Sequence, residues 1–338
     1  MKTLKIWFTD FYPGFEPKDN LITQLLFKSY NIEFDKNKPD YLIYSCHGHE
    51  FLNYNCVRIF YTGENLKPDF NLCDYAIGFD YIHFNNRYLR FPNFAFYESQ
   101  FQQLIISKNP GSLDLSAKKH FCNFIYANSN ADPTRDNFFY LLNKYKKVAS
   151  PGKHLNNISM DVGERYAKDW MFTKIEFQSS CKFSIAFENT SSPGYTTEKL
   201  LHAFITGTIP IYWGNPEVMK DFNPKAFINC HDFESFEDVV SKVKEIDNDD
   251  EMFLSMLNEP PFRNNIIPEN LKKEPLLVFL KNIFDQKRED AFQRSFYGTS
   301  AKYENDMKEM ILFRKKYRSM IQFLGLLKKT LKIMKRNR

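Results

Sequence analysis

The sequence lacks any long uninterrupted hydrophobic run, although 43% of its 338 residues are hydrophobic. No stretch approaches the ~20 apolar residues that a membrane-spanning helix needs. The first apolar run is broken by Lys5 and ends before Asp10, which makes it too short for the core of a signal peptide. We therefore expect a cytoplasmic protein without a transmembrane helix.

Glycine and proline are also scarce, with 12 and 16 residues. This scarcity excludes collagen-like and low-complexity chains. Charged residues make up 26% of the sequence. Together with the hydrophobic content, this proportion is typical of globular proteins and excludes a wholly disordered chain. A globular chain of this length typically forms two domains of about 150 residues each.

Paired cysteines are missing. The six cysteines are scattered and form no Cys-x-x-Cys pair, which argues against a zinc ribbon or a redox motif. In a reducing compartment we expect them to be buried thiols. The run Cys-His-Gly-His-Glu at residues 46–50 is interpreted as a polar loop rather than a metal site, because no second half of a ligand set accompanies it.

The net charge of +5 comes from one end of the chain. Residues 314–338 contain ten Lys and Arg and no Asp or Glu, whereas residues 1–313 contain 36 basic and 41 acidic residues. The body is therefore mildly acidic, which disfavours general nucleic-acid binding.

The same C-terminal segment carries a heptad pattern. Its apolar residues recur at alternating spacings of three and four: Met310, Phe313, Tyr317, Met320, Leu324, Leu327, Leu331 and Met334. This spacing is typical of a helix with one apolar seam. Dimerisation as a coiled coil, contact with an anionic membrane and packing onto the body all remain open, and RNA binding is a fourth alternative. The basic residues favour the membrane, at about 1 kcal/mol for each one near the surface.

Alternation of short apolar runs with helical patterns predicts an α/β protein with parallel sheets. In the first half we expect strands at 4–8, 41–45, 57–61 and 75–79, with a helix at 21–30. Residues 108–119 are polar and predict a linker. In the second half we expect strands at 120–126, 146–149, 181–187 and 209–213, and helices at 136–145, 196–206, 236–246 and 252–257. The acidic run 247–250 is interpreted as a solvated loop, not a metal-binding DxD motif.

The densest functional signal is FENTSSPGYTTEKLLHAFITGTIPIYWGNP at residues 187–216. A buried strand here runs into a polar loop and then into a helix start. Ligands of open parallel sheets bind at such strand ends, and a helix N-terminus attracts phosphate. Lys199 adds a positive charge, and Glu198 can accept hydrogen bonds from ribose hydroxyls. A capped helix with a surface Glu–Lys pair is the alternative.

This stretch resembles the signature of the α-1,3/4-fucosyltransferases. The matching motifs are Phe-Glu-Asn at 187–189, Tyr-Thr-Thr-Glu-Lys at 195–199, Pro-Ile-Tyr-Trp-Gly at 210–214 and Asp-Phe-Asn-Pro at 221–224. A second block, Phe-Tyr-Thr-Gly-Glu-Asn at 60–65 and Asp-Tyr-Ala-Ile-Gly-Phe-Asp at 74–80, is similar to the N-terminal block of Helicobacter-type members. The resemblance covers about residues 3–295.

The resemblance implies a GT-B fold, in which two Rossmann-like domains face each other across a cleft. Residues 1–115 would form the acceptor-binding domain and residues 116–300 the domain that binds GDP-fucose. Residues 301–338 would form a basic amphipathic helical tail. Relatives often carry tandem heptad repeats before such a tail, and this chain has no identical seven-residue repeat.

The resemblance also implies roles for single residues. Glu64, which by spacing alone is a turn carboxylate, matches the general base of the family. By its position alone, Arg135 would be a surface charge at the start of a helix. Together with Lys199 it matches the phosphate-binding pair of the family. The other residues carried over to the donor site are Asn189, Tyr195, Glu198, Asn128 and Ser129. The last two belong to a turn, Ala-Asn-Ser-Asn at 127–130, in which relatives often have Ser-Asn-Pro-Asn.

The expected reaction is inverting transfer of L-fucose from GDP-β-L-fucose to O3 of N-acetylglucosamine in Galβ1-4GlcNAc-type glycans, as in the synthesis of Lewis-type surface polysaccharide. No cofactor or metal site is expected; a divalent metal could stimulate but would not be essential. The acceptor would be an oligosaccharide or a lipid-linked glycan. The tail would hold the enzyme at the inner face of the membrane or form a homodimer. Alternatives are a transferase for another GDP-sugar and an inactive glycan-binding protein.

Overall fold

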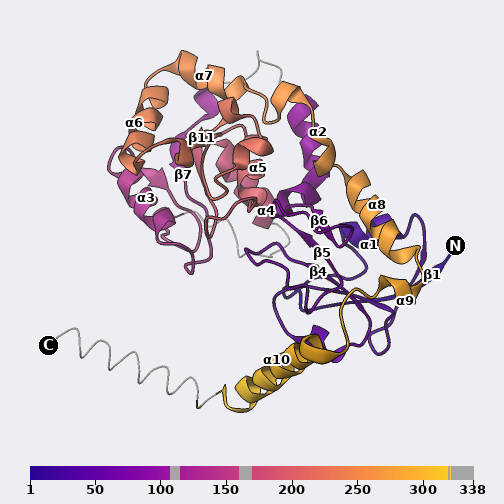
Figure 1. Cartoon of the computed structure of the whole chain (residues 1–338). Helices are drawn as coiled ribbons and strands as arrows, with labels where there is room; N and C mark the ends of the chain where they lie inside the picture. Colours follow the sequence, from indigo (N-terminus) through magenta and orange to yellow (C-terminus); the bar gives the residue numbers. More distant parts are fainter. Residues whose placement is uncertain (107–114, 160–169, 319, 321–338) are drawn as a thin grey trace. The chain divides into compact units, whose positions relative to one another are not determined.

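The computed structural model of the chain describes residues 1–106, 115–159, 170–318 and 320 (Figure 1). By their internal contacts the residues fall into two units. Unit 1 comprises Met1–Tyr61, Pro68–Ala76 and Ile283–Arg338, and unit 2 comprises Thr62–Lys67 and Ile77–Asn282. This division differs from the contiguous ranges 1–115, 116–300 and 301–338 expected from the sequence, because the chain crosses between the units more than once.

The first sheet has six strands in the order β2-β1-β3-β4-β5-β6. Pairing is parallel between β1 and β2, β1 and β3, and β3 and β4. The strands are β1 (Thr3–Thr9), β2 (Asn31–Phe34), β3 (Tyr41–Tyr44), β4 (Val57–Tyr61), β5 (Tyr75–Gly78) and β6 (Tyr88–Arg90). The α-helices of unit 1 in the described part of the chain are α1 (Leu21–Leu26), α9 (Arg288–Ala291), α10 (Gly298–Lys316) and the last two residues of α8 (Lys273–Phe284). Both β3 and β5 are buried along their whole length, as expected for strands covered on both faces.

The second sheet lies in unit 2 and has the order β11-β10-β9-β7-β8, with all neighbours parallel. Its strands are β7 (His120–Asn123), β8 (Val148–Ala149), β9 (Cys181–Phe187), β10 (Ile209–Trp213) and β11 (Ile228–Asn229). The helices α3 (Thr134–Asn143), α6 (Phe236–Asp247) and α7 (Asp250–Asn258) cover one side of this sheet, and α4 (Trp170–Ser179) and α5 (Glu198–Ile205) cover the other (Figure 1). The structure therefore confirms the predicted α/β class with parallel sheets.

A largely buried ion pair links residues 77–106, which include β6 and α2 (Glu98–Ile106), to the rest of unit 2. The guanidinium of Arg90 donates to both carboxylate oxygens of Asp221, at 3.0 and 2.6 Å. The guanidinium also lies 4.1 Å from the centroid of the Tyr81 ring. Removing either charge would leave the other buried and unpaired, which is costly.

Three predicted strands, 57–61, 181–187 and 209–213, have the observed bounds. The predicted solvated loop at 247–250 is wrong in part, because Asp247 ends α6 and its side chain is 1% exposed. Lys146 and Lys182 each approach its carboxylate to 2.9 Å. These two lysines outweigh the effect of burial and hold the pKa of Asp247 below its ordinary value.

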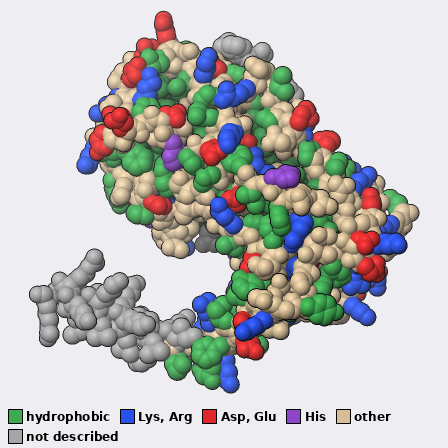
Figure 2. Space-filling model, in the orientation of Figure 1, with side chains coloured by type: hydrophobic (Ala, Val, Ile, Leu, Met, Phe, Trp, Pro, Cys, Tyr) green, Lys and Arg blue, Asp and Glu red, His purple; other side chains and the backbone are tan. Residues whose placement is uncertain are grey.

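Five of the six cysteines are buried and all six are free thiols, as expected. Residues 108–114 of the predicted linker 108–119, and most of the heptad segment, residues 321–338, lie outside the described residues. Within α10 and just after it, Met310, Phe313 and Met320 are exposed, and Figure 2 shows hydrophobic and basic side chains together at the end of this helix. No helix among the described residues is long and apolar enough to span a membrane.

Candidate active site

The predicted donor-site residues follow the carboxyl ends of β7 and β9. The chain goes from β7 to β8 at one edge of the second sheet and then returns to β9 on the other side of β7. The loops after β7 and β9 therefore leave the sheet at its topological switch point, where open parallel sheets bind ligands. The first loop carries Arg135 and the second carries Lys199, so the fold brings these two predicted residues to the same edge.

Arg135 lies in the first turn of α3 and is 1% exposed. Its Nη1 donates to Asn189 Oδ1 at 3.2 Å, its Nη2 donates to the carbonyl of Asn128, and its guanidinium lies 4.3 Å from the centroid of the Tyr126 ring. Its Nε is buried and has no hydrogen-bond partner within the described parts of the chain; the nearest carboxylate, that of Asp136, is 3.8 Å away. A buried guanidinium with an unused donor is suited to binding an anion.

Lys199 lies in the first turn of α5 and is held by two oxygens. Its Nζ donates to Glu188 Oε2 at 3.0 Å and to Thr197 Oγ1 at 2.8 Å. Glu188 is fully buried and also accepts from the backbone N–H and the hydroxyl of Thr197, both at 2.7 Å. Burial opposes the charge of Lys199, but Glu188 and Glu198 outweigh burial and keep its pKa above the ordinary value. Lys199 is therefore a fixed cation.

Tyr126 lies under Arg135 and is hydrogen-bonded to the end of β9. Its hydroxyl donates toward the carbonyls of Ile185 and Phe187 and accepts from the N–H of Phe187 at 2.8 Å. Burial raises the pKa of this hydroxyl, and the charges of Arg135 and Lys199 both act against that rise. The guanidinium of Arg135 thus lies over the ring of a buried tyrosine that is hydrogen-bonded to the end of β9.

Glu198 is the first residue of α5, and its side chain is 23% exposed. Burial acts against its ionisation, but the positive charges of Lys199 and Lys174 outweigh burial and keep its pKa well below the ordinary value. Its carboxylate lies 3.8 Å from Lys199 Nζ. A partly exposed, ionised carboxylate at this edge can accept hydrogen bonds from ligand hydroxyls.

The loop that carries Glu64 also belongs to unit 2. Within this loop, the N–H of Glu64 donates to Thr62 Oγ1 at 3.1 Å. A second bond leaves the loop: Asn65 Nδ2 donates to Thr190 Oγ1 at 2.5 Å. Burial raises the pKa of Tyr195, and the charge of Glu64 contributes to that rise. The half-buried Glu64 is therefore beside the loop between β9 and α5.

Gly194 allows the loop between β9 and α5 to lie close to the backbone of Phe79. The chain there has φ of +81°, and a Cβ atom would lie 2.2 Å from the carbonyl oxygen of Phe79. A side chain at this position is excluded by both the backbone angle and the space. The next residue, Tyr195, is buried, and its ring contacts that of Phe79 with 5.2 Å between centroids. Loop 188–199 is thus fixed against the end of β5.

The predicted turn residues have unequal surroundings. Asn128 is half-buried and its carbonyl holds Arg135, while its side chain accepts from the N–H of Asn130 at 2.8 Å. Ser129 is exposed in the same turn. The structure therefore brings Asn128, Arg135 and Asn189 into one hydrogen-bonded group, and Ser129 is next to this group in sequence.

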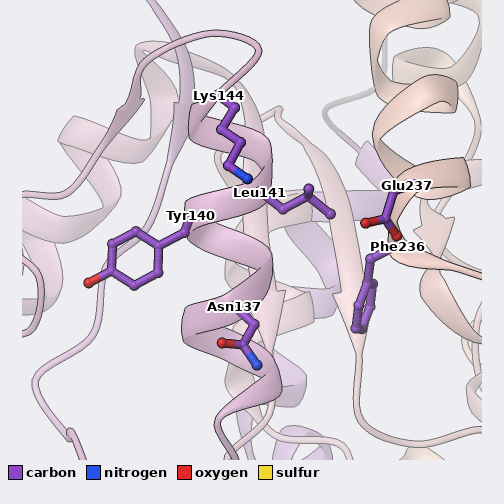
Figure 3. Close-up of a pocket in the computed structure, with 6 residues that line it drawn as sticks. All are labelled: Asn137, Tyr140, Leu141, Lys144, Phe236 and Glu237. Atoms are coloured by element: carbon purple, nitrogen blue, oxygen red, sulfur yellow. The ribbon is translucent and has the colours of Figure 1, made fainter.

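A separate surface pocket lies between α3 and α6. It has a volume of about 260 Å³, and its lining consists of Asn137, Tyr140, Leu141, Lys144, Phe236 and Glu237. Leu141 points toward Phe236, whereas Tyr140 points away from α6 (Figure 3). Its only cation, Lys144, is accompanied by the carboxylate of Glu237, so this pocket has no excess positive charge for a phosphate.

The geometry fits an anionic ligand at the edge between β7 and β9, with a carboxylate, Glu64, beside it. Within the described ranges, no group of three or more His, Cys, Asp or Glu side chains could hold a metal ion. Residues 46–49 form a loop before the short helix Glu50–Asn53, where Asp10 accepts from the N–H groups of Glu50 and Phe51 at 3.0 and 2.8 Å. Independence from metal remains a prediction.

Sequence reasoning did not identify Glu188 and Tyr126 as site residues. Glu188 is in the quoted Phe-Glu-Asn motif, but a carboxylate in a polar loop gives no sign that it is buried. Tyr126 was expected at the end of a strand, and only the position of Arg135 over its ring reveals its role. An aromatic residue shortly before a helix-opening arginine is the one signal that could have pointed to it.

Two family models match the chain. The N-terminal domain of alpha-(1,3)-fucosyltransferase FucT matches residues 6–97. The C-terminal domain of glycosyltransferase family 10 (fucosyltransferase) matches residues 115–259. Together these two matches cover both motif blocks on which the resemblance was based.

Among known proteins, alpha-(1,3)-fucosyltransferase FucT of Helicobacter pylori is 34% identical over 80% of this chain and 63% of its own length. The mouse (Mus musculus) 4-galactosyl-N-acetylglucosaminide 3-alpha-L-fucosyltransferase 9 is 28% identical over 46% of this chain and 41% of its length. The chain thus spans less than two thirds of these relatives. A crystal structure of an alpha1,3-fucosyltransferase has a TM-score of 0.74 at 30% identity, covering 88% of this chain and 93% of that one. A crystal structure of alpha1,3-fucosyltransferase with GDP-fucose has a TM-score of 0.70 at 30% identity and covers 87% and 94%.

The two parallel α/β sheets match the GT-B fold of the solved fucosyltransferase structures. The chain belongs to glycosyltransferase family 10, the fucosyltransferases, as its motifs predicted.

Proposed function

We propose that the protein is an inverting α-1,3-fucosyltransferase that moves L-fucose from GDP-β-L-fucose to O3 of N-acetylglucosamine in Galβ1-4GlcNAc-type acceptors. The observation that carries this proposal is the 2.5 Å hydrogen bond from Asn65 to Thr190. Through this bond the loop with Glu64 is attached to the loop that leads to Lys199. A base for the acceptor hydroxyl and a cation for the leaving group are thus held in one unit.

In the proposed reaction Glu64 takes the proton from O3 of the acceptor. The oxygen then forms a bond to C1 of fucose while the bond between C1 and the diphosphate oxygen breaks on the opposite face, which converts β-linked donor to α-linked product. GDP leaves with the electron pair, and the proton is released from Glu64 to solvent. General-base catalysis of this kind contributes about 10²- to 10⁴-fold to a rate.

Arg135 and Lys199 would stabilise the negative charge that develops on the diphosphate. The unused Nε of Arg135 and the fixed ammonium of Lys199 support this role. Asn189 and Tyr195 would contact fucose or phosphate, and Glu198 would accept from the ribose hydroxyls. Asn128 would act through its carbonyl, which orients Arg135, and Ser129 would contribute a hydroxyl at the same turn. Because two cations serve the diphosphate, we propose that no metal or cofactor is required.

Turnover of GDP-fucose with N-acetyllactosamine in excess EDTA tests the proposal, with the product linkage determined by NMR. An α-1,3-fucosylated product would support donor, linkage and metal independence together. Slow release of GDP without a glycosylated product would keep the donor assignment and require other acceptors. The absence of both would contradict the proposal and favour another GDP-sugar or an inactive glycan-binding protein.

Glu64→Gln provides the residue-level test. We expect the turnover number to fall by about 10²- to 10⁴-fold because the amide cannot accept the proton, while GDP binding, measured by calorimetry, stays unchanged. Glu33→Gln, on the exposed edge of β2 in unit 1, is the matched control. Activity of Glu64→Gln close to that of the control would exclude Glu64 as the base.

We further propose that the enzyme acts at the cytoplasmic face of the membrane on oligosaccharide or lipid-linked glycans of surface polysaccharide. The basic residues after Phe313 support contact with anionic lipid, and a homodimer through the heptad segment is the competing arrangement. Sedimentation with anionic liposomes, with and without residues 310–338, separates the two. Equal sedimentation of both forms would exclude the tail as an anchor.

A further inference from the structure

Glu188 is a buried carboxylate for which the proposed reaction has no use. It follows β9 directly, is 0% exposed, and accepts three hydrogen bonds of 2.7, 2.7 and 3.0 Å. A Cβ atom on Gly214, where φ is +156°, would lie 2.5 Å from Glu188 Cγ. Glycine at residue 214 therefore leaves the space that the carboxylate fills. Burying a carboxylate is costly unless it is paired and hydrogen-bonded, so its partners indicate its role.

The partners of Glu188 all lie at the beginning of α5. One oxygen accepts from the N–H of Thr197, and the other accepts from the Thr197 hydroxyl and from Lys199 Nζ. The carboxylate thus caps the helix and at the same time restrains the flexible side chain of Lys199. A lysine ammonium on a four-carbon chain is otherwise free to rotate.

The two hydrogen bonds that restrain Lys199 leave one N–H of its ammonium available for a ligand. An ammonium has three N–H donors, and Glu188 Oε2 and Thr197 Oγ1 take two of them. The carboxylate of Glu198, at 3.8 Å, is beyond hydrogen-bond distance. The third N–H has no hydrogen-bond partner among the residues that the structure describes, so the pairing fixes the ammonium and keeps one donor for a ligand.

We propose that Glu188 is a positioning residue: through Lys199 and Thr197 it holds one N–H of the Lys199 ammonium in place for the diphosphate of the donor. The inference deepens the proposed function and rests on it. Glu188 itself does not touch the donor. The ion pair also keeps Lys199 charged inside a buried site, because the negative partner offsets the loss of hydration.

The test is a double-mutant cycle of Glu188→Gln and Lys199→Met, with GDP affinity and the kinetics for GDP-fucose as readouts. The glutamine can still accept from the N–H of Thr197, so the helix cap is kept, but its uncharged amide no longer pairs with the ammonium. We expect kcat/KM for GDP-fucose to fall by about 10- to 100-fold, by analogy with the loss seen when residues that orient metal ligands are mutated. In the Lys199→Met background, the same change should have almost no further effect.

A purely structural cap predicts a different result. In that case Glu188→Gln would lower the melting temperature and would change kcat/KM by the same factor with and without Lys199. Additive effects on kcat/KM, or an unchanged kcat/KM in Glu188→Gln, would overturn the inference. Glu188→Asp, which keeps the charge on a shorter side chain, should restore part of the GDP affinity, and it also serves if the glutamine variant folds poorly.

Two controls separate this inference from the proposed function. Glu245→Gln removes an exposed carboxylate that is paired with Lys242 at 2.9 Å on α6, and it should change neither GDP affinity nor kcat/KM. If the unaltered protein neither binds GDP nor turns over GDP-fucose, the proposed function fails. If it does both and the cycle is additive, only the role of Glu188 fails.

Discussion

Two clusters of largely buried charges, one in each unit, differ in whether their donors are used. In unit 1 the cluster consists of Arg58, Asp74, Arg294 and Glu304, and we call it the α10 anchor because Glu304 lies on α10. In unit 2 the cluster consists of Arg135, Glu188 and Lys199, and we call it the donor-edge cluster. Both contain arginines that are no more than 2% exposed.

The α10 anchor is complete. Asp74 accepts from the N–H of Arg58 at 2.7 Å, and from the N–H and Nε of Arg294 at 2.9 and 3.0 Å. Arg58 donates to the carbonyls of Tyr54 and Leu72 and to Glu304, with its Nη2 2.9 Å from the Glu304 carboxylate. No residue of α10 is buried, so the helix is attached to unit 1 through polar contacts: these ion pairs and the hydrogen bond from the Tyr303 hydroxyl to Asp69 at 2.7 Å.

The donor-edge cluster is incomplete. The Nε of Arg135 and one N–H of Lys199 have no hydrogen-bond partner within the described ranges. A buried donor without a partner costs about 1–3 kcal/mol, a cost that an anionic ligand would remove. From this comparison we infer that completeness, rather than burial or charge, separates a structural cluster from the proposed binding site.

The strongest test breaks the complete cluster. Arg294→Met leaves Asp74 buried without its main cation, so we expect unit 1 to lose about 3–5 kcal/mol in free energy of unfolding. The measurement is unfolding in urea, monitored by hydrogen exchange of peptides from β3 and β4. GDP affinity should stay unchanged below the transition, because Arg294 and the donor-edge cluster belong to different units.

Arg288→Met is the matched control, since it removes an arginine whose ion pair with Asp40 is 44% and 34% exposed. Exposed pairs contribute about 0–1 kcal/mol. An equal and small effect of both substitutions would mean that the α10 anchor is not a stabilising cluster.

A smaller effect is expected in the incomplete cluster. Arg135→Lys keeps the charge but removes the planar fork and the contact with Tyr126, so GDP should bind about 10- to 100-fold more weakly. Calorimetric titration with GDP measures this loss. The melting temperature should change less than in Arg294→Met; a large loss of stability with unchanged GDP affinity would reverse the assignment of the two clusters.

Sequence reasoning found the cations of the donor-edge cluster but not the α10 anchor. Lys199 follows a predicted strand and opens a predicted helix, a local signal that can be read from a single chain. Arg135 was predicted through the family resemblance, because alone it indicates only surface charge at a helix start. The anchor joins Arg58 to a residue 246 positions away, and no local pattern reports such pairing. The strand β2 was missed for a different reason: its exposure alternates between full and partial, so it has no strongly apolar run.

Acid provides the mildest test, because it titrates one member of the α10 anchor. Burial works against the charge of Glu304, but hydrogen bonds from Arg58 and Lys308 prevail and lower its pKa to about 2 from 4.5. A carboxylate whose pKa is lower in the folded state than in the unfolded state stabilises the folded state. This contribution is complete when the pH is above the unfolded-state pKa, and it is lost as the pH falls toward the folded-state pKa. The attachment of α10 should therefore weaken between pH 4.5 and about 2.

Hydrogen exchange of peptides from α10 measures this weakening when wild type and Glu304→Gln are compared at the same pH, because the intrinsic exchange rate then cancels. We expect wild type to be better protected by a few-fold above pH 5 and the two proteins to converge near pH 2.5, where the carboxylate is increasingly protonated. Asp306→Asn, on the exposed side of the same helix, should match wild type throughout. Equal protection of wild type and Glu304→Gln at neutral pH would show that α10 is attached by contacts other than its buried ion pairs, and completeness would then no longer identify the structural cluster.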